Sequence, residues 1–242
     1  SKWLTMSAVS MGIFLATIDG SIVNVALPTL VKEFNTDFSI IQWVVLGYLL
    51  TVSTLILGIG RLGDMLGKKK LYAAGFIVFT LGSVLCGLSP TVYWLIGFRV
   101  LQGLGSALIM ALGMAIVTEA FPPQERGMAL GITGAVVSVG IAIGPSLGGL
   151  IISQLSWRWI FFVNLPVGIL GTLMVLRFVH SLNPTRKQKF DYVGAVALFF
   201  SLACLLLGMT LGQQIGFNRL PVYVLLGGWL VLMGLFIWIE WR

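Results

Sequence analysis

Two charged residues, Asp19 and Arg99, lie within long apolar stretches of the sequence. A charge inside a lipid bilayer is costly, so its presence predicts a function and a nearby partner. If both stretches are helices rising 1.5 Å per residue, both residues lie about 12 Å from the same membrane face. Their equal depth and opposite sign allow an ion pair or two stations on one proton path. The alternative is a buried ion pair that serves only the structure.

Polar side chains recur at helical spacing in the stretch that contains the arginine. Gln102, Ser106 and Met110 follow it by three, seven and eleven positions, so a helix places them on one face. An amide, a hydroxyl and a flexible thioether suit the wall of a cavity that holds varied ligands. Glycines share that face, so close helix packing is the alternative. Asn24 is the cavity candidate from the first stretch, although Asp19 lies nearly opposite it on the same helix.

The composition requires a membrane environment for these charges. Of the 242 residues, 58% are hydrophobic and 10% are charged, whereas soluble domains carry about 25% charged residues. The net charge of +7 arises mostly from short loops between apolar stretches, which predicts membrane topology and not nucleic-acid binding. The chain has one histidine and two cysteines, both within apolar stretches, so we predict no metal site. It also lacks a nucleophile–base pair, so we predict a protein that is not an enzyme.

Eight apolar stretches are long enough to cross a bilayer as helices, which predicts an all-α, polytopic membrane protein. Eleven Lys and Arg residues lie on one side of the resulting topology and three on the other. The positive-inside rule therefore predicts a multi-pass protein of the cell (cytoplasmic or inner) membrane with both termini in the cytoplasm. The predicted spans are 4–27, 39–60, 71–88, 92–115, 127–152, 159–179, 192–211 and 221–241.

The stretch Gly58–Gly63 matches the GxGxxG pattern of dinucleotide-binding loops. Such a loop needs a preceding strand and an acidic residue about 20 positions later. Here the glycines end a predicted membrane span and run into three lysines, so a nucleotide site is close to excluded. We predict instead a cytoplasmic loop in which the glycines permit a tight turn between two helices.

Five further motifs stand out along the chain. They are IDGSIVNVALP (Ile18–Pro28), GRLGDMLGKKK (Gly60–Lys70), RVLQGLGSA (Arg99–Ala107), GIAIGPSLGG (Gly140–Gly149) and WRWIFFVNLPVG (Trp157–Gly168). With these motifs in this order, the chain resembles the major facilitator superfamily, and within it the drug:proton antiporters with 14 spans. One position departs from the family pattern, because Met65 stands where a basic residue is usual.

The resemblance implies roles for residues in three of these regions. Asp19 and Arg99 would take part in proton coupling and substrate recognition. Asp64 would form a cytoplasmic latch with Arg126, although a helix-terminal cap is an alternative role for this aspartate. The remaining latch residues would be Gly60, Gly63 and Gly67. The antiporter helix motif would comprise Gly140, Gly144, Pro145, Gly148 and Gly149, with the proline bending its helix and the glycines allowing close packing.

The resemblance also implies a domain plan. Residues 1–180 would form an N-terminal six-helix bundle, 181–191 a basic cytoplasmic linker, and 192–242 two additional membrane helices. The second six-helix half is absent, so we expect a fragment of a longer chain.

The implied function is proton-coupled efflux of small amphipathic compounds, cations among them, with the proton as coupling ion and no cofactor. The expected partners are the bilayer and either the missing C-terminal half or a partner chain. The alternatives are a truncated, transporter-like scaffold or assembly subunit, and a half-transporter completed by a partner chain. An enzyme within the membrane is a weaker third reading.

Overall fold

A computed structural model describes residues 2–179 and 192–240, and within these ranges the regular structure is entirely helical. Eight of the helical segments are long and apolar enough to cross a membrane, which confirms the all-α, polytopic fold. The predicted linker 181–191 lies outside the described residues. The helices are α1 (Lys2–Glu33), α2 (Phe38–Ile41), α3 (Trp43–Leu66), α4 (Lys68–Gly87), α5 (Val92–Ala120), η1 (Pro123–Glu125), α6 (Arg126–Gln154), α7 (Trp159–Phe162), α8 (Asn164–Phe178), α9 (Tyr192–Ile215) and α10 (Leu220–Glu240).

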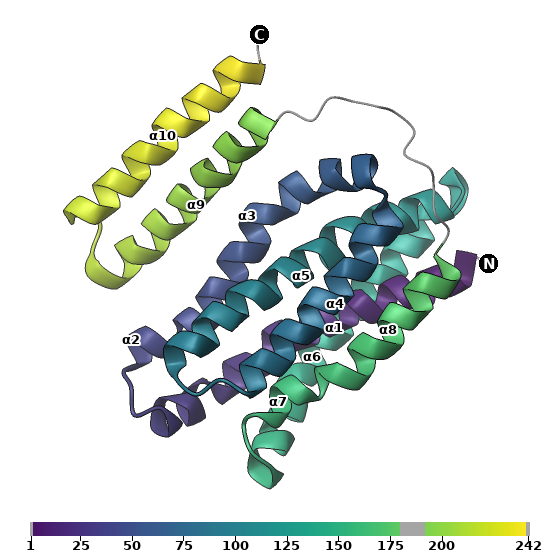
Figure 1. The fold of residues 1–242 in the computed structure, drawn as a ribbon, viewed down its shortest axis with the longest axis horizontal. Helices are drawn as coiled ribbons and strands as arrows, with labels where there is room; N and C mark the ends of the chain where they lie inside the picture. The colour runs from purple at the N-terminus through teal and green to yellow at the C-terminus, as the bar shows by residue number, and fades with distance from the viewer. Residues whose placement is uncertain (1, 180–191, 241–242) are drawn as a thin grey trace.

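Helix α5 is at the centre of the bundle that the first six spans form. It packs against α3, α4 and α1, while α1 also contacts α6 and α8. Figure 1 shows α5 running between these neighbours, with α6 on the far side of α1. The two helices that carry the buried charges, α1 and α5, are therefore direct neighbours.

Two of the predicted spans each comprise two helical segments that meet at one residue. The second span consists of the single turn α2 and the long helix α3, which meet at Gln42. The sixth span consists of the single turn α7 and helix α8, which meet at Val163. At both junction residues the backbone stays right-handed helical, with φ −59° at Gln42 and −60° at Val163, so each span remains close to the one helix that its apolar length predicted.

The apolar core has two clusters that are separated along α1. One cluster includes Met6, Val9 and Ile13 of α1 with aromatic side chains of α4. The other includes Ile22 and Val23 with the residues that surround Trp157. The α1 segment between them carries Asp19, so the structure places this charge in a polar layer between two apolar layers.

Helices α9 and α10 form an antiparallel pair beside the bundle. Helix α10 packs against α9, and α9 contacts α3, so the pair lies along one flank of the six-span bundle (Figure 1). Only 6% of the most apolar 18-residue stretch of α10 is buried inside the protein. Such an exposed and apolar helix requires a lipid environment, so the bilayer is a partner of this chain.

Candidate functional site

Asp19 and Arg99 form a fully buried ion pair. Arg99 Nη1 donates to Asp19 Oδ2 at 2.5 Å, and both side chains have 0% relative exposure. Of the two arrangements that the sequence allowed, the structure shows the direct pair. Each charge compensates the other, since an unpaired charge at this position would carry a large desolvation cost.

Two amide side chains complete the shell of donors to the Asp19 carboxylate. Gln102 Nε2, from α5, and Asn164 Nδ2, from α8, each donate to Oδ1 at 2.9 Å. Asn164 Nδ2 also donates to Ser83 Oγ of α4 at 2.9 Å. Hydrogen bonds that end on a charged group are stronger than neutral ones, so the carboxylate joins α1 to α5 and α8.

The Arg99 guanidinium is anchored on several sides. Its Nε donates to the Val44 carbonyl at 3.0 Å and its Nη1 also donates to Gln102 Oε1 at 2.7 Å. The ring of Tyr48 lies 4.1 Å from the Arg99 Cζ, a distance typical of a cation–π contact. Arg99 Nη2 is buried and has no hydrogen-bond partner among the described residues.

This arrangement lets a proton or another cation replace Arg99 as the positive partner of Asp19. A proton on the Asp19 carboxylate would remove the negative charge that strengthens its bonds to Arg99 and to the two amides. Proton binding would leave Arg99 buried without a counter-charge, which is strongly unfavourable unless the surroundings change. The pair is therefore suited to link the binding of a proton or cation to a conformational change.

Three residues of this network were not singled out from the sequence: Tyr48, Ser83 and Asn164. The Tyr48 hydroxyl lies 2.7 Å from Ser106 Oγ and 3.1 Å from the Ala16 carbonyl, while Ser83 Oγ donates to the Phe161 carbonyl at 2.9 Å. A buried polar side chain in the middle of an apolar span is itself a signal. In the sequence this signal distinguished only the charged residues, because a hydroxyl or an amide is common in membrane helices.

The residues predicted to line a substrate cavity are placed in three different environments. Gln102 and Ser106 are fully buried in the polar network. Met110 is half-buried, whereas Asn24 is exposed and donates to the carbonyl of Gly20 in its own helix. Asn24 thus lies on the opposite face of α1 from Asp19. The role of these four residues in substrate binding stays a prediction.

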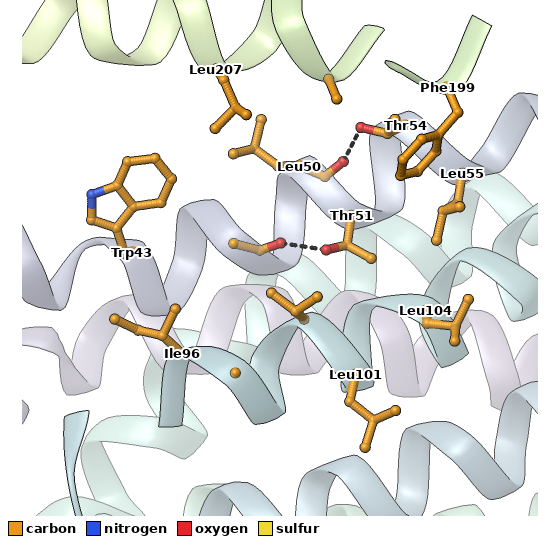
Figure 2. Close-up of a pocket in the computed structure, with 14 residues that line it drawn as sticks. Trp43, Leu50, Thr51, Thr54, Leu55, Ile96, Leu101, Leu104, Phe199 and Leu207 are labelled. Atoms are coloured by element: carbon orange, nitrogen blue, oxygen red, sulfur yellow. Dashed lines mark hydrogen bonds between the residues drawn. The ribbon is translucent and has the colours of Figure 1, made fainter. Parts of the chain in front are cut away.

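A cavity of about 590 Å³ lies between α3, α5 and α9. Figure 2 shows side chains of all three helices around it, with the Trp43 indole at one end and the Phe199 ring near the other. The Thr51 and Thr54 hydroxyls at its wall donate to carbonyls of their own helix. The cavity therefore offers an almost wholly apolar surface.

A second cavity, of about 770 Å³, opens between α1 and α6 with Val167 of α8 at its margin. Its α1 wall combines aromatic rings and thioethers with the hydroxyls of Ser7 and Ser10. Surfaces rich in methionine and aromatic side chains accommodate ligands of varied shape. Neither cavity is lined by the four residues predicted from the sequence.

The antiporter helix motif lies where α6 crosses α1. A Cβ atom at Gly140, Gly144 or Gly148 would meet α1 atoms at 2.2, 1.8 and 2.7 Å, respectively. Ser21 Oγ also lies 3.2 Å from the Gly140 carbonyl, as a donor across the interface. Pro145 is exposed within α6, which remains a helix from Arg126 to Gln154, and a Cβ at Gly149 would meet nothing within 4 Å. Three of the motif glycines therefore form the contact with α1.

We expect the variant Gly144→Ala to be less stable than the parent by about 1–3 kcal/mol, the usual cost of overpacking. Its new Cβ would lie 2.8 Å from Ser21 Cβ and 3.1 Å from the Ile22 backbone nitrogen, so rotation of the Ser21 hydroxyl cannot make room. Gly134→Ala is the matched control, because a Cβ there meets nothing within 4 Å of the described residues. Thermal unfolding of the two purified variants in detergent checks the prediction. Equal stability of the two would contradict it.

The cytoplasmic latch region differs from the predicted loop. Helix α3 continues through Gly60 and Gly63 and ends at Leu66, and only Gly67, with φ +94°, makes the turn. The prediction of a loop that begins at Gly60 is therefore wrong. Gly63 lies at a close contact between α3 and α5, since a Cβ there would lie 2.3 Å from Leu112 Cδ2. No strand is present beside these glycines, because they are helical.

The charges of the latch region are paired differently from the predicted Asp64–Arg126 contact. Lys68 Nζ lies 2.7 Å from Asp64 Oδ1 and forms an ion pair with it. Lys68 also pairs with Glu119 at the end of α5. Arg126 Nε donates to the Phe121 carbonyl at 3.4 Å. Asp64 lies in the last turn of α3 and makes no cap to α4. A latch that joins Asp64 to Arg126 stays a prediction.

Comparisons with known proteins agree on one family. A family model described as the Major Facilitator Superfamily matches residues 9–241. The chain is 41% identical to riboflavin transporter RibZ of Clostridioides difficile over 85% of its own length and 45% of that protein. It is 38% identical to multidrug resistance protein Stp of Mycobacterium tuberculosis, over its whole length and 45% of that protein. The chain thus spans about half the length of these curated relatives.

A solved structure supports the same fold. The human organic anion transporter MFSD10 (TETRAN) superimposes with a TM-score of 0.66 over 85% of this chain and 55% of its own. The sequence identity is 16%, so the likeness concerns the arrangement of the helices.

Proposed function

Because this chain belongs to the major facilitator superfamily, which identifies it as part of a transporter and not an enzyme, we propose that it forms the first portion of a proton-coupled efflux protein for small amphipathic compounds. The observation that carries this proposal is the Asp19–Arg99 ion pair, which is fully buried between two apolar layers. Packing of the helices against one another would not by itself need charges at this depth.

Coupling would follow from the energetics of this pair. A proton that binds Asp19 removes the negative charge and leaves Arg99 without compensation in its present site. Breaking a buried pair in this way is unfavourable by about 3–5 kcal/mol, so the protonated protein favours a different arrangement of helices. A proton can shift a conformational equilibrium only through such a difference between states.

The substrate class is inferred from the cavities and from the names of relatives. Both cavities expose mainly apolar side chains, and the one beside α1 adds hydroxyls, thioethers and aromatic rings. Such walls suit amphipathic molecules of varied shape. Among the relatives, one is named a riboflavin transporter and others are named multidrug resistance proteins. We include amphipathic cations, because a carboxylate can alternate between a proton and a cation.

The rest of the transporter would complete the site. We propose that a C-terminal half, or a partner chain, covers the exposed faces of α1 and α6, and that α9 and α10 are the additional pair of a 14-span protein. The cytoplasmic latch and proton coupling through Asp19 belong to the same proposal. Lysines and arginines near the ends of the spans support a cytoplasmic location for both termini.

The test uses the full-length protein reconstituted into liposomes, with ethidium as the transported probe. An imposed proton gradient should drive ethidium movement against its own gradient, and collapse of the gradient by a protonophore should stop it. Empty liposomes and liposomes with heat-inactivated protein are the controls. Ethidium movement that ignores the proton gradient would contradict proton coupling. A native chain that carries no second half and moves no probe would favour the scaffold alternative.

A further inference from the structure

We propose that Asn164 is a positioning residue for Asp19, whose amide ties the ionised carboxylate to α8 through a bond that weakens when a proton binds. The inference rests on the proposed role of Asp19 in proton coupling. It assigns to the sixth span a direct part in that coupling, through a side chain that touches the proton-carrying group.

The position of Asn164 along the chain suits this role. It is the first residue of α8, directly after the junction at Val163 where α7 ends. Its side chain is buried, with 1% relative exposure. The backbone of Val163 stays right-handed helical (φ −60°, ψ −23°), so the chain holds Asn164 at the end of α8 that faces Asp19.

The amide of Asn164 is held in one orientation by its neighbours. Both hydrogens of Nδ2 are used, one by Asp19 Oδ1 and one by Ser83 Oγ, each at 2.9 Å. The Ser83 hydroxyl donates its own hydrogen to the Phe161 carbonyl, so its lone pairs face the amide. Ser83 therefore accepts from Asn164, and this fixes the N–H of Asn164 toward the carboxylate.

Protonation of Asp19 weakens this arrangement. The carboxylate accepts N–H bonds from Arg99, Gln102 and Asn164, which occupy three of its roughly four lone-pair sites. A proton on Asp19 removes the negative charge, so each of these charge-assisted bonds becomes weaker. The bond to Asn164 is the one that joins the carboxylate to α8.

The other two partners of Asp19, Arg99 and Gln102, are held by further hydrogen bonds. Arg99 is also bound to the Val44 carbonyl and to Gln102 Oε1, so Arg99 and Gln102 hold each other on α5. The other titratable groups near Asp19 are Tyr48 of α3 and Cys86 of α4. Among the remaining helices packed against α1, α2 and α7 carry no titratable residue. Those of α6 and α8, Arg126 and Arg177, lie at the distant cytoplasmic ends.

The docking of α8 on the bundle does not depend on this hydrogen bond. A Cβ at Gly168 would lie 2.0 Å from Thr80 Oγ1, and one at Gly171 would lie 2.2 Å from Phe76 Cε1. These close contacts attach α8 to α4 along its length. A variant at Asn164 is therefore expected to remain folded, and its effect on Asp19 can be measured.

The experiment is an infrared titration of the full-length protein in detergent. The C=O band of protonated Asp19 is assigned by its loss in Asp19→Asn, and its growth is followed as the pH falls. Because Asn164 stabilises the ionised carboxylate, Asn164→Ala should move this titration toward higher pH by about tenfold in proton concentration, the size expected for one hydrogen bond to a charged group. Asn164→Gln, which keeps the amide, should restore part of the difference.

Thr172→Val is the control on the same helix, because the Thr172 hydroxyl bonds only the Gly168 carbonyl among the described residues. Its titration should coincide with that of the parent. If Asn164→Ala does not fold, Ser83→Ala replaces it, since loss of the Ser83 acceptor frees the amide to turn and should displace the titration in the same direction. Superimposable titrations of the parent and the Asn164 or Ser83 variant would overturn the inference. So would the absence of a titrating Asp19 band in all of them.

Ethidium exchange by the same variants separates this inference from the proposed function. If the parent exchanges no protons for ethidium but the Asn164→Ala titration is displaced, the transport proposal fails and the link between Asn164 and Asp19 holds. If the parent couples transport to protons and the titrations coincide, only the inference about Asn164 fails. In a coupled parent, Asn164→Ala should displace the pH profile of exchange, whereas Asp19→Asn, alone or combined with Asn164→Ala, should show no proton-coupled exchange above background.

Discussion

Asp19→Asn is expected to reduce proton-driven ethidium transport by the full-length protein to the background of empty liposomes. The asparagine amide has nearly the shape of the carboxylate but binds no proton at physiological pH, so it cannot carry the coupling ion. Arg99 then remains buried without a counter-charge. We expect the free energy of unfolding to fall by up to about 3–5 kcal/mol, the cost of breaking a buried ion pair from one side.

A second variant separates the proton-carrying role of Asp19 from a purely structural one. Asp19→Asn combined with Arg99→Met removes both charges, and such replacements are often neutral or stabilising. The double variant should therefore recover thermal stability and remain unable to couple transport to protons. Asp37→Asn is the control, since Asp37 is exposed and its side chain caps no helix. Proton coupling that survives in either Asp19 variant would refute the assigned role.

Gly105→Ala is expected to have the largest effect on folding, with a loss of about 3 kcal/mol or more of stability, at the upper end of overpacking effects. A Cβ at Gly105 would lie 2.3 Å from the backbone nitrogen of Phe79, 2.7 Å from its Cα and 2.8 Å from the Gly75 carbonyl oxygen. These are backbone atoms of α4, so no side-chain rotation can relieve the overlap. Helices α4 and α5 would have to separate beside the Arg99 site.

The matched control for Gly105 lies on the same helix. A Cβ at Gly97 would meet nothing within 4 Å, so Gly97→Ala should leave stability unchanged or raise it by up to about 1 kcal/mol, the helix-propensity gain of alanine over glycine. Size-exclusion profiles and thermal unfolding in detergent measure both variants. A Gly105→Ala protein that unfolds at the temperature of the Gly97→Ala protein would show that the α4–α5 contact is looser than described.

The membrane character and the number of long helices were predictable from the sequence alone. Hydropathy sums the transfer preferences of about 20 residues, and in a bilayer a continuous apolar stretch must satisfy its backbone internally as a helix. All eight predicted spans therefore reappear as apolar helical segments. The same reasoning selected Asp19 and Arg99, because a charge in such a window is rare enough to stand out.

The ends of the helices were less predictable. Gly60 and Gly63 were read as part of a loop, whereas they continue α3 as far as Leu66. Glycine has a poor intrinsic helix propensity, but a Cβ at Gly63 would lie 2.3 Å from the terminal Cδ2 of Leu112, so glycine lets α3 pack closely on this side chain of α5. Packing outweighs the local preference there, and a single sequence contains no record of which neighbour a glycine will face.

The network around the ion pair was decided by the tertiary structure. Helical periodicity placed Gln102 on the face of Arg99, and the equal depth of the two charges allowed their contact. Asn164 reaches Asp19 only because α8 packs beside α1, and Ser83 reaches Asn164 because α4 packs against α8. The sequence by itself determined which segments cross the bilayer and which charges lie inside it, since both depend on the sum of local residue preferences. The partners of those charges depend on how each helix is rotated and packed, and only contacts between segments far apart in the chain set that rotation.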